Sequence, residues 1–250
     1  MRFPRPGRYK DRIYLLPNIL TSGNIFFGFF SVISTINGSF RKAGFAILIA
    51  MVFDLLDGRI ARLTKSSSQF GEEYDSLADL VSFGIAPALL LFIWSGLNIT
   101  TPPFQKFGWL AAFFFVACGA LRLARYNVQP VKRNFVGLPI PVSAALISSG
   151  VLLYTELEQK WSTEWLCFAI FLTLGLLMVS SIPYKSYKDL EIRERHPFPL
   201  LVSVVLFVTV LAVRPEAVLF FLSLAYVLIG GIWGSLDKRR MAGKRVVSKE

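Results

Sequence analysis

The chain has 250 residues, of which 54% are hydrophobic and 17% are charged, whereas soluble domains carry about 25% charged residues. This composition excludes a disordered chain and a fibrous repeat. It also excludes a secreted disulfide scaffold, because the chain has only two cysteines, Cys118 and Cys167, and both lie within apolar runs. The net charge of +11 indicates an anionic membrane surface and no nucleic-acid partner, since the basic residues flank apolar runs.

Apolar runs long enough to cross a membrane, about 20 residues each, predict an all-α polytopic bundle. The first run follows a basic stretch, as a signal peptide would, but it is too long and lacks a small-residue cleavage site, so we expect a permanent span. Only Arg214, Pro215 and Glu216 separate the last two runs. The predicted spans are eight: 16–36, 43–63, 75–95, 108–126, 138–155, 164–182, 198–213 and 217–235.

Lysines and arginines predict the orientation of these spans. With the N-terminus in the cytoplasm, inner segments hold 18 of the 27 basic residues and outer loops hold 5. This bias favours a multi-pass protein of the cell membrane with both termini cytoplasmic. No internal repeat is visible, so we expect one main membrane domain over 16–190. Around it we expect a basic segment (1–15), additional helices (191–236) and a basic tail (237–250).

Four aspartates lie at membrane depth, where each ionised group costs about 2.5–3.5 kcal/mol on insertion scales. Asp54 and Asp57 are spaced i, i+3 in the second span, and Asp75 and Asp79 are spaced i, i+4 in the third. Each pair therefore shares a helix face. The short polar linker 63–73 predicts antiparallel neighbours, so all four carboxylates can meet near the cytoplasmic ends.

This acidic cluster predicts a site for hard cations, because its ligands are all oxygens: Mg²⁺, Mn²⁺ or Ca²⁺. Two such ions suit phosphoryl-type transfer. Gly58 and Ala61 share the face of Asp54 and Asp57 and leave room for a ligand, and Gly71 is expected to break the linker. The alternative is structural: the acids would pair with neighbouring bases and only fix helix packing, the candidates being Arg59, Arg62 and Lys65.

The residues in this region read Asp54-x2-Asp57-Gly58-x2-Ala61-Arg62-x8-Gly71-x3-Asp75-x3-Asp79. This pattern is similar, at every fixed position, to the signature of the CDP-alcohol phosphatidyltransferase family. The resemblance implies that the first three aspartates ligate two metal ions. It also implies that Asp79 contacts a metal and acts as the catalytic base. Residues expected to line the site of the CDP group are Gly58, Ala61, Arg62 and Gly71.

Further segments resemble the integral-membrane phosphatidylserine synthases of prokaryotes, a branch of this family, over about residues 14–190. They include 16–24, 119–127, 135–141 and 178–188. The resemblance implies transfer of a phosphatidyl group from CDP-diacylglycerol to L-serine, which gives phosphatidylserine and CMP, in a homodimer with its active site on the cytoplasmic side.

The sequence indicates less clearly which residues bind the acceptor alcohol than which residues bind metal. Arg122 and Arg125 are spaced i, i+3 near the cytoplasmic end of the fourth span, where they could bind the carboxylate of serine, bind a phosphate, or extend to the interface. Asn18, Thr21 and Asn24 could contact the nucleotide or hydrogen-bond between helices.

Two alternatives stay open at this point. The same chemistry could use glycerol 3-phosphate, inositol or its phosphate, or choline. A cation- or proton-coupled transporter would instead spread its carboxylates through the membrane and often show an internal repeat.

Overall fold

The structure is a computed structural model that describes residues 10–64, 68–97, 104–128, 137–156, 164–182 and 213–247. Every regular element in these ranges is helical, which confirms the predicted all-α class. The elements are α1 (Lys10–Ile36), α2 (Phe40–Leu63), α3 (Gln69–Asp79), the π-helix η1 (Leu80–Ile85), α4 (Ala86–Trp94), α5 (Phe104–Val128), α6 (Ile140–Glu156), α7 (Glu164–Val179) and α9 (Pro215–Val247).

Three of the described helices are long and apolar enough to cross a membrane: Leu15–Ile36, Gln69–Trp94 and Phe107–Val128. Shorter apolar helices occupy Ile140–Thr155, Glu164–Val179 and Pro215–Gly231. The predicted span 198–213 falls outside the described residues except for its last residue, so the number of spans stays a prediction. The protein is nevertheless a helical bundle with membrane character.

The third apolar segment begins earlier than its hydropathy suggests. Ser68 caps α3 and accepts a hydrogen bond from the backbone N–H of Gly71 at 3.0 Å. The helix therefore starts at Gln69, six residues before the predicted start of the span at 75. Gly71 lies within its first turn, so the prediction that Gly71 breaks the linker is wrong. The physical reason is the serine cap, followed by Glu72 in the first turn.

A π-helical turn follows directly after Asp79. α3, η1 and α4 form one continuous helical segment, and Pro87 stands in the first turn of α4. Proline has no N–H and its ring clashes with the carbonyl of residue i−4 inside an α-helix. A wider turn just before Pro87 relieves that conflict, and such turns are frequent at functional sites.

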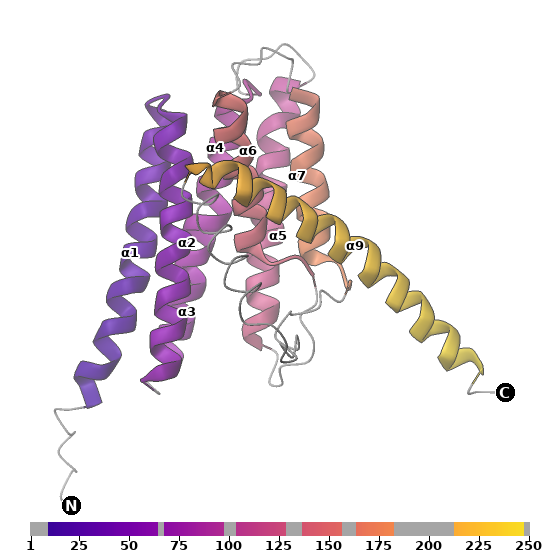
Figure 1. Cartoon of the computed structure of the whole chain (residues 1–250), viewed down its shortest axis with the longest axis horizontal. Coiled ribbons are helices and arrows are strands. Elements are labelled where there is room, and N and C mark those ends of the chain that lie inside the picture. Colours follow the sequence, from indigo (N-terminus) through magenta and orange to yellow (C-terminus); the bar gives the residue numbers. More distant parts are fainter. Residues whose placement is uncertain are drawn as a thin grey trace, which may run out of the picture.

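α1 and α2 form an antiparallel hairpin along one side of the bundle (Figure 1). Gly38 makes their tight turn with a positive φ of 70°, a conformation that costs glycine little. The segment α3–η1–α4 packs on α1, α6 packs between α2 and α9, and α5 packs on α7. The core between them contains the fully buried rings of Phe83, Phe115 and Phe171.

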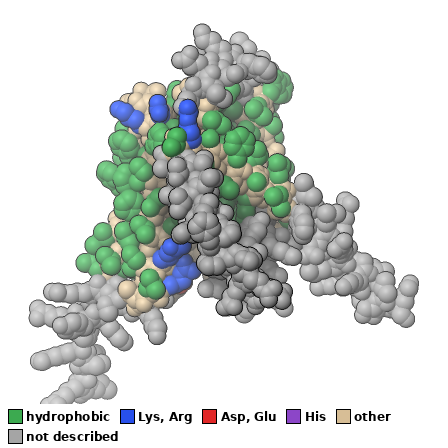
Figure 2. All heavy atoms as spheres, viewed as in Figure 1, with side chains coloured by type: hydrophobic (Ala, Val, Ile, Leu, Met, Phe, Trp, Pro, Cys, Tyr) green, Lys and Arg blue, Asp and Glu red, His purple; other side chains and the backbone are tan. Residues whose placement is uncertain are grey.

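Figure 2 shows many hydrophobic side chains on the bundle surface, with Lys and Arg side chains gathered towards its two ends. Exposed large apolar residues include Phe26, Phe29, Trp109 and Phe113, each more than half exposed. Apolar patches of this extent mark a membrane-facing surface in a helical protein.

Candidate active site

The four aspartates meet at one end of the bundle. Carboxylate oxygens of Asp54, Asp57 and Asp75 all lie within 4.8 Å of one another. Asp79, the last residue of α3, lies close enough to Asp54 for the two side chains to interact directly. Two helices that are separated by a short linker thus bring together the four acids that the sequence singled out.

The packing of α2 leaves space beside this cluster. α2 contacts the long helical segment mainly through η1 and α4, whereas α3 packs on α1. A Cβ atom added to Gly58 would meet no atom closer than Arg62 Nη2, at 4.0 Å. Ala61, almost one turn further, is half-buried. Gly58 therefore borders open space next to the acids, as a binding site for a bulky nucleotide requires.

The described arginines of α2 do not neutralise the cluster. Arg62 is exposed, and its Nε donates a hydrogen bond to the carbonyl oxygen of Gly58 at 2.7 Å. Among the described side chains, neither Arg59 nor Arg62 forms an ion pair with the aspartates. The alternative in which these arginines pair with the acids thus finds no support; Lys65 lies outside the described residues.

The donor atoms fit a divalent cation. Asp75 Oδ1 and Asp79 Oδ1 are both buried and lack a hydrogen-bond partner. Carboxylates held this close repel one another unless a proton or a cation lies between them. An all-oxygen set without histidine or cysteine selects Mg²⁺, Mn²⁺ or Ca²⁺. The cluster could therefore hold a metal ion, and Asp54, Asp57 and Asp75 are the three whose geometry suits this directly.

α1 supports the cluster from the side. The buried hydroxyl of Thr21 donates to Asp57 Oδ2 at 2.8 Å and lies 3.1 Å from the carbonyl oxygen of Pro17. Asn18 Oδ1 is 3.5 Å from the position that a Cβ would take at Gly71. Thr21 thus hydrogen-bonds between helices, one of the two roles open to it, and it does so onto a predicted metal ligand.

Asn24 lies one turn further along α1. It is completely buried, and both polar atoms of its side chain lack a partner in the structure. Its backbone carbonyl accepts a hydrogen bond from Ser82 Oγ at 2.9 Å. This contact fixes α1 against η1, where Gly28 also meets Ser82 so closely that a Cβ would clash with the backbone.

α5 brings one of the two predicted arginines to the cluster. Arg122 is half-buried, interacts electrostatically with Asp79, Tyr126 and Tyr226, and keeps its Nε buried without a partner. Its guanidinium carbon lies 6.0 Å from the centre of the Tyr126 ring. Arg125, almost one turn further, is exposed. The two arginines therefore differ in their surroundings, a difference that their spacing alone did not indicate.

A polar bridge between α3 and α5 was not anticipated. The side-chain amide of Asn127 donates to Glu73 Oε2 and to Ser76 Oγ, both at 3.1 Å. Glu73 and Ser76 flank Asp75, and Asn127 is the last residue of the segment 119–127. Their positions beside predicted site residues were the feature of the sequence that could have indicated this bridge. Tyr226, on α9, offered no signal, because it stands in an ordinary apolar run.

The depth of the acids also bears on the transporter alternative. All four predicted ligands gather at one end of the bundle. Within the described ranges, the acids that flank them, Glu72 and Glu73, belong to that same end, and the buried Glu216 lies apart from them, beside Arg41. A transport path would spread its carboxylates through the membrane, so the arrangement favours a single catalytic centre.

Comparison with known proteins identifies the class. A sequence model of the family CDP-alcohol phosphatidyltransferase matches residues 14–178. The chain belongs to this family of membrane-embedded transferases, as its motif predicted.

Individual relatives narrow the class further. The chain is 37% identical over 223 residues to the CDP-diacylglycerol–serine O-phosphatidyltransferase of Helicobacter pylori (strain ATCC 700392 / 26695). The aligned region covers 87% of this chain and 90% of the relative. The chain is 36% identical to the enzyme of the same name from Saccharomyces cerevisiae, over 74% of this chain and 64% of the relative. It is also 38% identical to the archaetidylserine synthase of Methanothermobacter thermautotrophicus, over 68% of this chain and 69% of the relative.

Proposed function

We propose that this protein transfers the phosphatidyl group of CDP-diacylglycerol to the hydroxyl of L-serine and releases CMP. The observation that carries the proposal is the cluster of four aspartates beside the open space at Gly58. The relatives support serine as the acceptor, because the bacterial and yeast relatives are named serine O-phosphatidyltransferases and the archaeal relative is named archaetidylserine synthase.

The reaction is one direct displacement. The serine oxygen attacks the phosphorus that carries the diacylglycerol, a new P–O bond forms, and the P–O bond to the CMP phosphate breaks. Asp79 accepts the proton of the serine hydroxyl, and the electrons of the broken bond leave with CMP. Asp79 suits this role because it closes α3 beside the other acids and keeps one carboxylate oxygen without a partner.

A pair of divalent cations, Mg²⁺ or Mn²⁺, would be held by Asp54, Asp57, Asp75 and Asp79 and, when bound, would neutralise the diphosphate and its leaving oxygen. Thr21 keeps Asp57 in its orientation through the hydrogen bond at 2.8 Å. Gly58, Ala61 and Arg62 border the space for the CDP group, with Asn18 and Gly71 on the α1 and α3 side. Ca²⁺ also suits an all-oxygen site.

Arg122 is the better placed of the two arginines for binding an anionic group. It lies near Asp79 and keeps its Nε free of a described partner. A guanidinium binds a carboxylate or a phosphate through paired hydrogen bonds, so Arg122 would hold the carboxylate of serine next to the base. Arg125 is exposed and would assist the binding of this anionic group from the membrane interface.

The cellular setting is part of the same proposal. Apolar helices and an excess of Lys and Arg near the predicted inner ends support a multi-pass protein of the cell membrane, with the acids facing the cytoplasm. Lipid tails would stay in the bilayer. We further propose a homodimer and a catalytic domain over 16–190, with 191–236 as additional helices between this domain and the basic tail.

An acceptor screen tests the proposal. The purified full chain in detergent receives CDP-diacylglycerol and Mn²⁺ or Mg²⁺, with serine, glycerol 3-phosphate, inositol or choline offered separately, and mass spectrometry identifies the lipid product. We expect phosphatidylserine and CMP from serine alone, and no product after chelation. A different phospholipid would overturn serine as the acceptor, and CMP release that is independent of metal would overturn the assignment of the aspartates.

A further inference from the structure

A second cavity lies far from the aspartates, at the turn between α1 and α2. Its volume is about 680 Å³, within the usual range of ligand pockets. Arg41 stands 13 residues before Asp54 on the same helix, a separation of about 20 Å at 1.5 Å per residue. The cavity is therefore not part of the acidic site.

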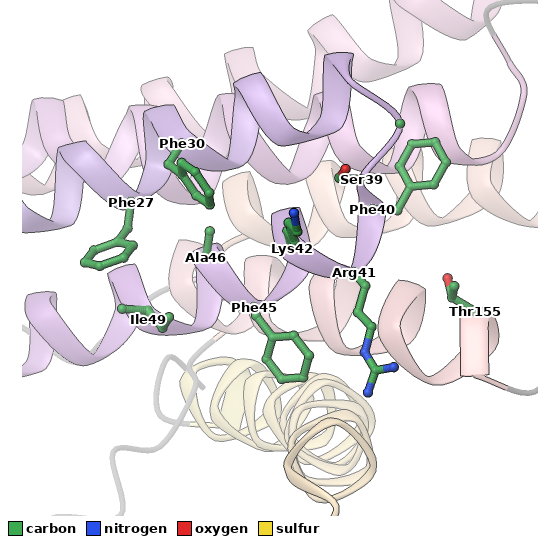
Figure 3. Close-up of a pocket in the computed structure, with 11 residues that line it drawn as sticks. Phe27, Phe30, Ser39, Phe40, Arg41, Lys42, Phe45, Ala46, Ile49 and Thr155 are labelled. Carbon is green, nitrogen blue, oxygen red and sulfur yellow. The ribbon is translucent and has the colours of Figure 1, made fainter.

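The cavity combines an aromatic wall with a basic rim. Figure 3 shows Phe27 and Phe30 projecting from α1, and Phe45 from α2, while Arg41 and Lys42 extend from the first turn of α2. Both cations are exposed, and neither forms an ion pair among the described side chains, although Arg41 and the buried Glu216 line the same small neighbouring cavity. The lining of this cavity itself contains two cations and no acid, so an apolar channel with a positively charged mouth matches an acyl chain that ends in an anionic group.

The sequence of the first turn of α2 breaks an ordinary helix rule at this position. The N-terminus of a helix carries partial positive charge, which acidic residues offset and basic residues worsen. α2 has no acidic residue in its first turn, and its cap residue Ser39 makes no side-chain capping hydrogen bond. Arg41 and Lys42 stand there instead. An external anion would remove this unfavourable arrangement, because the helix end and both cations would face the same negative charge.

We propose that this cavity binds a membrane phospholipid with a net negative head group. Its phosphate would lie against Arg41 and Lys42, and one acyl chain would lie along Phe27, Phe30 and Ile49. A second copy of the chain fits less well. A two-fold interface centred here would bring the same residues of both copies together, and Arg41 and Lys42 would face like charges without a lining acid.

Native mass spectrometry of the delipidated full chain in detergent tests the proposal. The probes are dioleoyl-phosphatidylglycerol and dioleoyl-phosphatidylcholine, which share their acyl chains and differ in net charge. We expect the anionic lipid to bind more tightly, and the double variant Arg41→Gln/Lys42→Gln to bind it about 30-fold more weakly, since each cation near a surface is worth about fivefold. The matched control is Arg59→Gln, an exposed cation on the same helix, which should leave the preference intact.

A second pair of variants tests the apolar wall. Ile49 is 40% exposed and lines the cavity, whereas Val52 is 53% exposed and does not. Ile49→Trp should displace the lipid and Val52→Trp should not, while CMP release and elution volume show that each variant is folded. Equal binding of the two lipids, unchanged binding by the double variant, or a dimer that Ile49→Trp splits would each overturn the proposal. None of these outcomes depends on the identity of the acceptor.

Discussion

Replacing Thr21 by valine tests whether the hydrogen bond from α1 prepares the acidic cluster for metal. The change removes the hydroxyl that donates to Asp57 Oδ2 at 2.8 Å and keeps nearly the same volume. Thr21 and Asp57 are each only 3% exposed, so water has little access to replace the lost donor. A hydrogen bond to a charged group contributes about 1.5–3 kcal/mol, which corresponds to a change of roughly 10- to 100-fold. Mutating residues that hydrogen-bond to metal ligands typically lowers metal affinity or activity by a factor of the same size.

The assay is CMP release as a function of Mn²⁺ or Mg²⁺ concentration. For Thr21→Val we expect the half-maximal metal concentration to rise by about 10- to 100-fold, with partial recovery of activity at high metal. Thr21→Ser keeps the hydroxyl and should behave nearly as the parent. Ser22→Ala is the matched control, because Ser22 is exposed and bonds to Tyr74 and to its own helix. An unchanged metal requirement in Thr21→Val, together with lower thermal stability, would refute the reasoning and leave Thr21 a packing role.

Three further changes test other parts of the site. Asp79→Asn should lower turnover by about 10²- to 10⁴-fold, because the base is lost, while CDP-diacylglycerol still binds; full turnover would contradict the assignment. Gly58→Leu extends a side chain into open space, so the thermal midpoint should hold while the KM for CDP-diacylglycerol rises; an unchanged KM would show that no ligand enters there. Gly28→Val would collide with the backbone of Ser82 and should cost about 1–3 kcal/mol of stability, measured by thermal unfolding in detergent.

Much of the chemistry was predictable because it depends on spacing within helices. The pairs at i, i+3 and i, i+4 place each set of aspartates on one face wherever the helix ends, so errors in helix boundaries did not disturb them. The start of α3 was misplaced because hydropathy follows the apolar part of a helix, whereas Ser68 begins it in a polar stretch. The start of the helix is therefore marked by the local capping pattern and not by the apolar run.

Contacts between distant segments were harder to predict. Whether Arg122 or Arg125 faces the acids depends on how α5 rotates against α3, and no periodicity in so apolar a helix specifies that rotation. The same holds for Tyr226, which reaches the surroundings of Arg122 from a helix outside the family match at 14–178. The cavity at Arg41 and Lys42 also arises from packing. The sequence predicted these two bases in an outer loop before the span 43–63, whereas they lie in the first turn of α2.

Asn24 offers a final test that separates stability from activity. Its amide is fully buried with both polar atoms unpaired, and such a group costs about 1–3 kcal/mol. Asn24→Leu, which has a similar volume, should therefore stabilise the ligand-free protein and raise its thermal midpoint by roughly 2–4 °C for each kcal/mol.

If the amide pairs with a bound substrate or ion in the working enzyme, the same variant should lose turnover while it gains stability. The matched control is Ser31→Ala, which also removes a buried unpaired group, one turn beyond Gly28 on α1; it should gain stability without losing turnover. Loss of stability in Asn24→Leu would mean that the amide already has a partner in the protein. A gain in stability with full turnover would mean that the polar group serves no ligand. Opposite changes in stability and turnover are the result that only a functional role for Asn24 predicts, because removing a purely structural amide would leave turnover unchanged.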